Sequence, residues 1–327
     1  MRGATAFWLV YCCVSVCMAA ELDLQGHRGA RGLKPENTLA AFAEALSVGV
    51  STLELDVGLS KDDVVVVSHD PRLNPDITRG PDGEWLRAPG PPLRALAWDA
   101  IRRYDVGRIR PGTDYARRFL HQQPVDGARI PALSEVFALT ERAGNDSVRF
   151  NIETKLTPLE PDVAAEPAFF AERLIEALRA AGVTGRASIQ SFDWRTLQHV
   201  QSVAPGITTV YLTVQQSWQD NVRQGRPGPS PWTAGFDVDD HGGSIPWLVE
   251  AAGGTVWSPY FRELTAPTLA EARARGLRVI VWTVNDVDDM RRLIDLGVDG
   301  IITDYPDRLR AVMHEAGMTL PMRTPVR

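Results

Sequence analysis

LDLQGHRGARGLKPENTLAAFAEALSVGVSTLELDV, residues 22–57, is the stretch that decides the fold. It opens with a short apolar run, Leu22–Gly26, which is typical of a strand. Asn37–Val48 then repeats apolar side chains at helical spacing, and Pro35 before it is a signal for a helix start. Thr52–Val57 returns to a strand-like pattern. A strand, a helix and a second strand in this order predict a parallel βαβ unit.

The same alternation continues along the chain. Further strands are predicted at Val64–Ser68, Val148–Glu153, Ala187–Gln190, Thr208–Leu212, Thr255–Trp257, Leu277–Thr283 and Gly300–Ile302. Further helices are predicted at Ser134–Arg142, Pro167–Ala181, Trp194–Val203, Pro267–Arg275 and Asp286–Leu296. Repeated strand–helix units indicate the α/β class, and their number favours a (β/α)₈ TIM barrel.

The pattern contains one strand more than such a barrel needs. Thr52–Val57 and Val64–Ser68 are separated by a segment too short for a crossover helix. Either one of the two strands extends a hairpin, or one helix of the barrel is missing.

Three parts of the chain depart from the alternation. Residues 72–129 are rich in proline, glycine and arginine and show little periodicity, so we expect an inserted subdomain after an early strand. Without it the remaining chain has the size of a typical barrel, about 250 residues. Residues 215–244 are expected to form a long loop. We place the barrel domain at 21–318, followed by a flexible tail at 319–327.

The first 20 residues resemble a secretory signal peptide. Arg2 precedes an apolar run, and Ala19 and Ala20 follow it. A buried strand or an anchor helix is the alternative, but the run is short for a membrane span. We therefore expect export, with the mature chain periplasmic or secreted rather than lipid-tethered. All three cysteines lie within this segment, so we expect neither disulfides nor thiolate chemistry in the mature chain.

Composition and charge narrow the classes of function. Hydrophobic residues make up 44% and charged residues 23%, which is typical of a globular protein, and the net charge is −6. No long basic run occurs, so nucleic-acid binding is not expected. Stable membrane insertion of the mature chain is not expected either. The oligomeric state is left open.

Acidic residues lie near the ends of two predicted strands. Glu54 and Asp56 are two positions apart, and therefore point to the same face; Glu153 stands near the end of a later strand. Three carboxylates at one barrel mouth repel each other unless a cation neutralises them, and Ca²⁺ and Mg²⁺ prefer oxygen ligands. The alternative is that these acids pair with the abundant arginines.

Two histidines, His27 and His69, directly follow apolar strands. Histidine can accept or donate a proton near neutral pH, so the two could act as base and acid on opposite sides of a scissile bond. For either one alone, a structural hydrogen bond is the competing interpretation.

Four further residues are candidates for contacts with a substrate. Arg28 and Lys155 could bind a phosphate, and Lys155 is one of only three lysines in the chain. Phe192 and Trp282 follow or end predicted strands and could line a pocket, with core packing as the alternative.

These residues occur in motifs that resemble the glycerophosphodiester phosphodiesterase family. The motifs are HRGARGLKPENTLAAF, ELDVGLSKDDVVVVSHDP, NIETK, VWTVND and GIITDYPD, in this order from about Gln25 to Asp307. The resemblance implies a phosphatidylinositol-phospholipase-like TIM barrel with an inserted subdomain. It also implies metal-dependent hydrolysis of substrates such as glycerophosphocholine and glycerophosphoethanolamine to glycerol 3-phosphate and an alcohol.

The resemblance further implies roles for individual residues. Glu54, Asp56 and Glu153 would hold one divalent cation, Ca²⁺ or Mg²⁺. His27 and His69 would form the acid–base pair, and Arg28 and Lys155 would contact phosphate. Two alternatives remain open: a phospholipase that acts on intact lipids on the same barrel, and an exported binding protein without turnover.

Overall fold

Eight parallel strands form a closed barrel at the centre of the molecule, and their bounds match the predicted strands closely. The computed structural model describes residues 21–326. The barrel strands are β1 (Asp23–Gly26), β2 (Thr52–Leu59), β4 (Arg149–Thr154), β5 (Ala187–Ser191), β6 (Thr208–Thr213), β9 (Val256–Pro259), β10 (Arg278–Val281) and β11 (Gly300–Thr303). They pair in this order, and β1 closes the ring by pairing with both β11 and β2. The predicted (β/α)₈ barrel is therefore confirmed.

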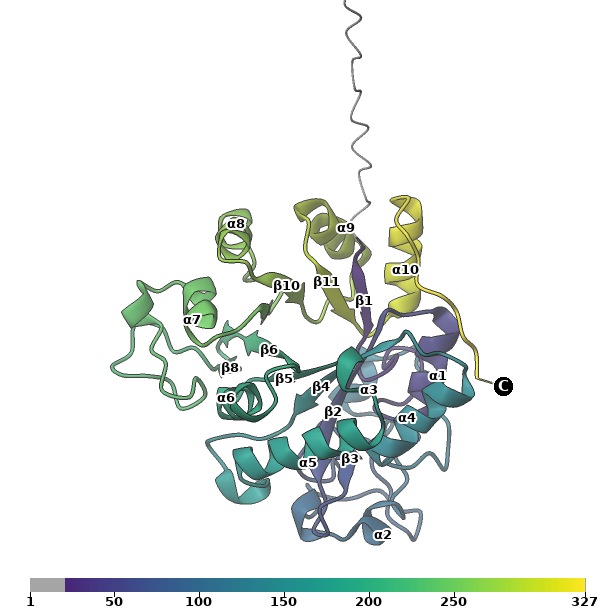
Figure 1. Ribbon diagram of the computed structural model, residues 1–327. Helices are drawn as coiled ribbons and strands as arrows, with labels where there is room; N and C mark the ends of the chain where they lie inside the picture. The colour runs from purple at the N-terminus through teal and green to yellow at the C-terminus, as the bar shows by residue number, and fades with distance from the viewer. Residues whose placement is uncertain (1–20, 327) are drawn as a thin grey trace, which may run out of the picture.

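An α-helix follows each barrel strand and packs on the outside (Figure 1). These helices are α1 (Leu39–Val48), α4 (Leu133–Arg142), α5 (Pro167–Ala180), α6 (Trp194–Val203), α7 (Ile245–Ala251), α8 (Ala266–Ala274), α9 (Val287–Leu296) and α10 (Pro306–Glu315). Helices α7 and α10 were not predicted. The first helix begins two residues later than predicted, at Leu39, because Thr38 is the N-cap and accepts a hydrogen bond from the Ala41 amide.

The extra predicted strand forms a hairpin, so no barrel helix is missing. This strand, β3 (Val65–Val67), runs antiparallel to β2, with Val57 opposite Val67. Residues 60–64 make the connecting turn, which explains why no helix fits between the two strands. The hairpin extends the sheet outside the barrel, next to the segment that leads to α4.

The segment between β3 and α4, which contains the predicted insertion 72–129, forms a small unit at one side of the barrel (Figure 1, bottom). It contains the 3₁₀ helix η1 (Leu93–Ala95) and the short helices α2 (Trp98–Ile101) and α3 (Asp114–Arg118). Its apolar side chains Leu73, Leu93, Ile101, Val106 and Ile130 form a separate cluster together with Val66 of β3. Burial of this cluster holds the unit together with little regular secondary structure.

The remaining elements are short. They are the 3₁₀ helices η2 (Pro161–Val163), η3 (Thr184–Arg186) and η4 (Asp239–His241), and a two-stranded hairpin, β7 (Gln215–Gln216) with β8 (Gln219–Asp220). The predicted long loop 215–244 thus contains a small hairpin and one 3₁₀ turn.

The interior of the barrel is polar on one side and apolar on the other. On the polar side, the buried Asn151 amide donates to the side-chain oxygens of Gln25 and Gln190, each at 2.9 Å. The apolar side is filled by Val210, Val256, Ile280 and Ile302, which come from β6, β9, β10 and β11. This asymmetry continues upward into the cavity at the ends of the strands.

The two chain ends bear on several predictions. The predicted signal peptide, 1–20, lies outside the described residues. Residues 319–326 have no regular secondary structure, but the Thr324 amide donates to the Leu46 carbonyl at 2.9 Å, and its hydroxyl accepts from Asn145 at 2.9 Å. Among residues 21–326, no helix has the length and apolar character that a membrane span requires.

Candidate active site

A cavity of about 470 Å³ opens where the barrel strands end. All eight strands are parallel, so their carboxyl ends meet at one mouth, which is where TIM barrels carry their sites. The predicted site residues that line the cavity are His27, Arg28, Glu54, His69, Glu153, Lys155, Phe192 and Trp282. Asp56 is fully buried beside it, at 0% exposure.

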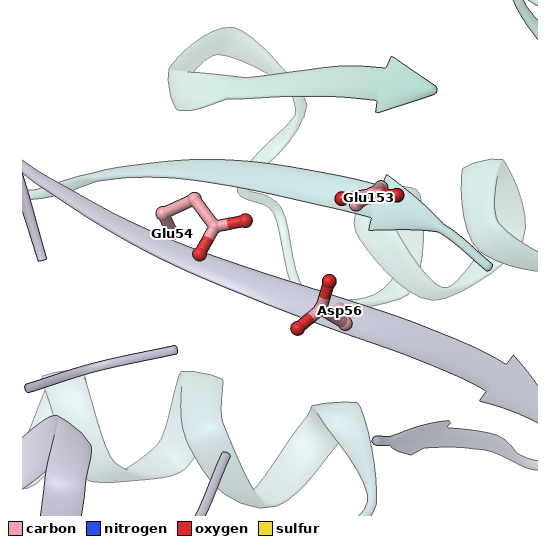
Figure 2. A group of neighbouring side chains, drawn as sticks. All are labelled: Glu54, Asp56 and Glu153. Atoms are coloured by element: carbon pink, nitrogen blue, oxygen red, sulfur yellow. The ribbon is translucent and has the colours of Figure 1, made fainter. Parts of the chain in front are cut away.

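Three carboxylates gather at the floor of this cavity, and all of them are buried. Glu54 and Asp56 project from β2, and Glu153 projects from the neighbouring strand β4, where it stands opposite Asp56 (Figure 2). One oxygen of each lies within 4.8 Å of the others. Adjacent parallel strands in register therefore bring together acids that are about 100 residues apart in sequence.

The surroundings of these carboxylates disfavour the charged form of two of them, Glu54 and Glu153. Burial, together with the nearby Asp56 charge, raises the pKa of Glu54 well above its usual range. Burial also raises the pKa of Glu153. For Asp56 burial acts in the same direction, but Arg28 and His69 outweigh it and lower the pKa of this residue. A cation among the three groups would remove the penalty on Glu54 and Glu153.

The donor set fits a hard divalent cation. The buried Oδ1 atom of Asp56 has no hydrogen-bond partner within residues 21–326. A buried carboxylate oxygen without a partner is costly, and a metal ion is one group that can satisfy it. Three carboxylates with no thiolate or paired histidine ligands are typical of Ca²⁺ or Mg²⁺ rather than zinc.

The turn after β1 brings backbone and side chain of Arg28 into the site. Arg28 has a positive φ of 50°, and Gly29 follows at 84°. A Cβ atom on Gly29 would lie 2.7 Å from the Ala41 backbone, so only glycine fits here. The tight turn directs the Arg28 amide to Glu54 Oε2 at 2.8 Å.

The Arg28 side chain is held by two acids. Its Nη1 atom donates to Glu36 Oε1 at 2.7 Å, and its Nε atom lies 3.3 Å from Asp56 Oδ2. Burial alone would lower the pKa of Arg28, but these two carboxylates outweigh it and raise that pKa. The guanidinium is therefore a fixed positive charge beside the acidic cluster.

Asn37 was predicted only as the first residue of a helix, but it contacts the carboxylate cluster. Its φ is 55°, and its Nδ2 atom donates to Asp56 Oδ2 at 2.9 Å. Asparagine is among the residues that tolerate a left-handed backbone. The turn before α1 thus orients one carboxylate of the cluster.

His27 is oriented by Asp304, a carboxylate that directly follows the last barrel strand, β11. Its Nδ1 atom lies 2.7 Å from Asp304 Oδ1, while its Nε2 atom lies 3.9 Å from Glu54 Oε2. An ionised Asp304 accepts a hydrogen bond, so Nδ1 carries the proton and Nε2 keeps its lone pair. Burial, reinforced by the nearby Arg31 charge, lowers the pKa of His27 to about 3.

Asp304 was not among the predicted site residues. Arg31 donates to both of its oxygens, from Nε at 2.8 Å and Nη2 at 3.0 Å, and Asn285 Nδ2 donates to Oδ2 at 2.7 Å. Burial would raise the pKa of Asp304, but Arg31 and His27 outweigh it and lower that pKa. The residue directly follows β11, so the rule that selected His27, a polar residue just after a strand, would also have found it.

His69 has a similar arrangement but is more exposed, with 31% of its side chain accessible. Its Nδ1 atom lies 2.9 Å from Asp70 Oδ1, and Asn74 donates to Asp70 Oδ2 at 2.7 Å. Burial would raise the pKa of Asp70, but the His69 hydrogen bond and charge outweigh it and lower that pKa. Both cavity histidines thus have Nδ1 bound to a carboxylate.

Lys155 is a second, largely buried cation in the cavity, with 15% of its side chain accessible. Its Nζ atom lies 2.6 Å from Glu153 Oε1 and 3.8 Å from Asp56 Oδ1. Burial would lower the pKa of Lys155, but these two acids outweigh it and raise that pKa. Lys155 and Arg28 therefore stay positively charged and can meet an anionic group above the carboxylates.

The cavity has two chemically different walls. One is polar, and the segment between β3 and α4 contributes Tyr115 and Arg118 to it. The other is aromatic: Phe192 and Trp282 lie there as predicted, together with Trp218 and Trp232, which were not predicted. Trp218 stands on the β7–β8 hairpin, within the stretch expected to be loop, where no pattern in the sequence identified it.

Comparison with known proteins agrees with this arrangement. Residues 27–308 match the glycerophosphoryl diester phosphodiesterase family. A glycerophosphodiester phosphodiesterase of Caldanaerobacter subterraneus is 29% identical over 292 residues, which cover 89% of this chain and 97% of the relative.

Solved structures show the same architecture. A putative glycerophosphoryl diester phosphodiesterase from Silicibacter pomeroyi is 34% identical with a TM-score of 0.81, covering 92% of this chain and 95% of the other. An Oleispira antarctica phosphodiesterase in complex with the product sn-glycerol-3-phosphate is 19% identical with a TM-score of 0.63, covering 90% and 97% of the two chains. The chain described here therefore belongs to the glycerophosphoryl diester phosphodiesterase family and is an enzyme that hydrolyses glycerophosphodiesters.

Proposed function

We propose that this enzyme hydrolyses small glycerophosphodiesters, such as glycerophosphocholine and glycerophosphoethanolamine, to glycerol 3-phosphate and an alcohol. The reaction would depend on one divalent cation, Ca²⁺ or Mg²⁺, and on His27 and His69. The observation that carries the proposal is the placement of three buried carboxylates, two fixed cations and two carboxylate-bound histidines around one cavity. The product bound by the Oleispira enzyme is the one expected here.

Glu54, Asp56 and Glu153 would hold the cation. When bound, such an ion supplies positive charge that stabilises the negative charge developing on the phosphoryl group. Arg28 and Lys155 add positive charge at the same place, so the phosphate is bound and oriented by fixed groups. The Arg28 side chain is braced by Glu36, which keeps it in position without neutralising the whole site.

The two histidines would move the protons. His27 Nε2 takes a proton from the attacking hydroxyl, which belongs to water or to the glycerol 2-hydroxyl, as the new O–P bond forms. His69 gives a proton to the oxygen of the leaving alcohol as its bond to phosphorus breaks. If the glycerol hydroxyl attacks first, water then opens the cyclic phosphate, so either route consumes one water molecule.

Both histidines have Nδ1 bound to a carboxylate, so the assignment of His27 as the base rests on its deeper position beside Glu54. Asp304 fixes the proton on Nδ1, which leaves Nε2 unprotonated and directed toward the carboxylates where the phosphoryl group would bind. His69, at the more exposed side of the cavity, is left as the acid that releases the alcohol.

The test is release of glycerol 3-phosphate from glycerophosphocholine by the chain without residues 1–20. Activity that EDTA abolishes and that one of the two metals restores would support the proposal. Activity on intact phospholipids, and none on glycerophosphodiesters, would support the phospholipase alternative instead. A folded protein with no turnover on either substrate would support the binding-protein alternative.

We also propose that the chain is exported, on the strength of the signal-like residues 1–20. Expression of the full chain in a Gram-negative host, followed by cell fractionation and N-terminal sequencing, tests this. The expected result is a periplasmic product that begins at residue 20 or 21.

A further inference from the structure

Four aromatic rings from different parts of the barrel pack together at one wall of the cavity, and three of them, Phe192, Trp218 and Trp282, line it. Phe192 follows β5, Trp218 stands on the β7–β8 hairpin, Tyr260 follows β9 and Trp282 follows β10. The Trp282 ring lies 5.3 Å from that of Phe192, 5.6 Å from that of Tyr260 and 6.4 Å from that of Trp218. Trp282 is therefore the centre of the group, which we call the aromatic cluster.

The rings of this cluster stand at steep angles to one another. Trp282 makes angles of 83° with Phe192 and 82° with Trp218, and Trp218 makes an angle of 89° with Tyr260. These are edge-to-face contacts, which hold the rings together as one rigid group. Recognition of a quaternary ammonium group commonly uses several aromatic faces around one position.

The central ring of the cluster has no free hydrogen-bond donor to offer the cavity. The indole N–H of Trp282 donates to the Ser258 carbonyl at 2.9 Å, so its polar edge is satisfied by the barrel. Within residues 21–326, the cavity lining contributed by the strand ends of β5, β6 and β10 includes no carboxylate. A primary ammonium needs strong acceptors for its N–H groups, so this wall suits it less than a quaternary ammonium, which has no N–H groups.

A negative charge lies behind the hairpin that carries Trp218. Glu263 Oε1 accepts hydrogen bonds from the Gln215 amide at 2.9 Å and from Gln216 Nε2 at 2.7 Å. The other oxygen, Oε2, is buried and has no hydrogen-bond partner among the described residues. This carboxylate anchors the base of the hairpin that carries Trp218.

The aromatic cluster begins next to the phosphate position. Lys155 Nζ lies 6.0 Å from the centroid of Phe192, and Lys155 also contacts Glu153 and Asp56. The alcohol part of a substrate whose phosphate binds at Lys155 would therefore lie next to these rings. The opposite wall, with Arg31, Tyr115 and Arg118, presents polar groups that suit the hydroxyls of glycerol.

We propose that the aromatic cluster is the binding site of the alcohol head group and that it selects a quaternary ammonium, so that choline esters are preferred. The inference rests on the proposed function and names the part of the substrate that is recognised by this wall. Trp218 is 59% exposed and stands on a short hairpin, so its ring can be replaced without loss of core packing. It is the residue on which the preference can be tested.

The test compares two substrates that differ in charge but hardly in shape. One is glycerophosphocholine; the other is the 3,3-dimethylbutyl ester of glycerol 3-phosphate, in which carbon replaces the ammonium nitrogen. For the wild-type enzyme we expect kcat/KM to be about tenfold higher for the choline ester, the size of effect given by cation–π contacts. Trp218→Leu keeps an apolar side chain at this position. In this variant the ratio of the two kcat/KM values should fall toward one, mainly because kcat/KM for the choline ester decreases.

Trp247→Leu is the matched control, because Trp247 is also an exposed tryptophan but lies on α7, outside the cavity. It should leave both rate constants unchanged. Equal kcat/KM for the two substrates in the wild type would overturn the head-group proposal and leave the proposed function intact. An equal fall in kcat/KM for both substrates in Trp218→Leu would also overturn it, because the wall would then make apolar contacts only. Turnover of neither substrate would overturn both proposals.

Discussion

The Nδ1 atom of His27 lies 2.7 Å from Oδ1 of Asp304, and the two residues are 277 positions apart. They meet because β1 pairs with β11, which closes the barrel. Through this contact the last strand decides which nitrogen of His27 carries the proton. The proposed base is therefore set up by the closure of the fold, and a residue that need not touch the substrate becomes a positioning residue.

Replacing Asp304 by asparagine is expected to lower kcat by about two orders of magnitude, which is the scale of general acid–base catalysis. An asparagine amide can donate to Nδ1, and this favours the tautomer with the proton on Nε2, where it blocks base function. KM should change little, because Asp304 is not among the cavity-lining residues. The downfield ¹H resonance of the His27 Nδ1 proton should disappear.

Asp240→Asn serves as the control, because Asp240 is an exposed acid on η4. It should leave kcat and the resonance unchanged. Normal kcat in Asp304→Asn would remove Asp304 from the mechanism.

Asp304 should also contribute to stability in a pH-dependent way. Its folded-state pKa is lowered, because Arg31 and His27 outweigh the effect of burial. The stabilisation is therefore fully present above the unfolded-state pKa, about 4, and is lost as the pH falls through the folded-state value. Asp304→Asn should lower the free energy of unfolding by about 2 kcal/mol at pH 7.

Urea unfolding at pH 7 and again in steps below pH 4 measures this effect. The difference between wild type and Asp304→Asn should narrow as the pH falls. A constant difference at all pH values would mean that the ionised carboxylate is not its source.

The barrel could be predicted from the sequence because each strand is a short apolar run bounded by polar residues. The same local signal found Glu54, His69 and Glu153, since parallel strands bring their carboxyl ends to one mouth. Helix α10 was missed, although Pro306 stands in its first turn, because its motif was interpreted only as a strand end. Helix α7 is a seven-residue helix next to a long irregular stretch, too short for a convincing period.

Other features depend on contacts that no local pattern records. The roles of Asn37 and Asp304 come from a positive-φ turn and from strand closure, respectively. Trp218 reaches the cavity because the β7–β8 hairpin folds against the Trp282 ring. Trp218 lies in a polar stretch of sequence, and nothing in that stretch indicates this contact.

The assignment of His69 as acid and His27 as base predicts opposite responses to the leaving group. An ester of glycerol 3-phosphate with p-nitrophenol needs little protonation of the leaving oxygen. His69→Ala should therefore lose two or more orders of magnitude in kcat on glycerophosphocholine, but much less on the p-nitrophenyl ester.

His27→Ala should be impaired on both substrates, because the base is needed in either case. Recovery of the p-nitrophenyl activity in His27→Ala, with none in His69→Ala, would exchange the two roles. His199→Ala, at a histidine that pairs with Glu172 outside the cavity, should behave as wild type.

Glu54→Gln should separate the metal response from the stability of the metal-free protein. The pKa of Glu54 is raised by burial and by the Asp56 charge, so the charged form is disfavoured when no cation is present. A neutral glutamine should therefore leave the metal-free Tm close to that of the wild type. Addition of Ca²⁺ or Mg²⁺ should raise the Tm of the wild type and not that of the variant, because a cation that binds only the folded state stabilises it by mass action.

Thermal unfolding with increasing metal concentration measures both quantities, and Asp240→Asn is again the control that should keep the wild-type shift. The outcome that would contradict a metal site at these carboxylates is an equal metal-induced shift in wild type and Glu54→Gln. A large fall in the metal-free Tm of Glu54→Gln would instead show that the Gln190 and Arg28 hydrogen bonds to this carboxylate, at 2.7 and 2.8 Å, dominate its contribution to stability. The two results are read from the same titration, so the charge of Glu54 and its hydrogen bonds can be assessed independently.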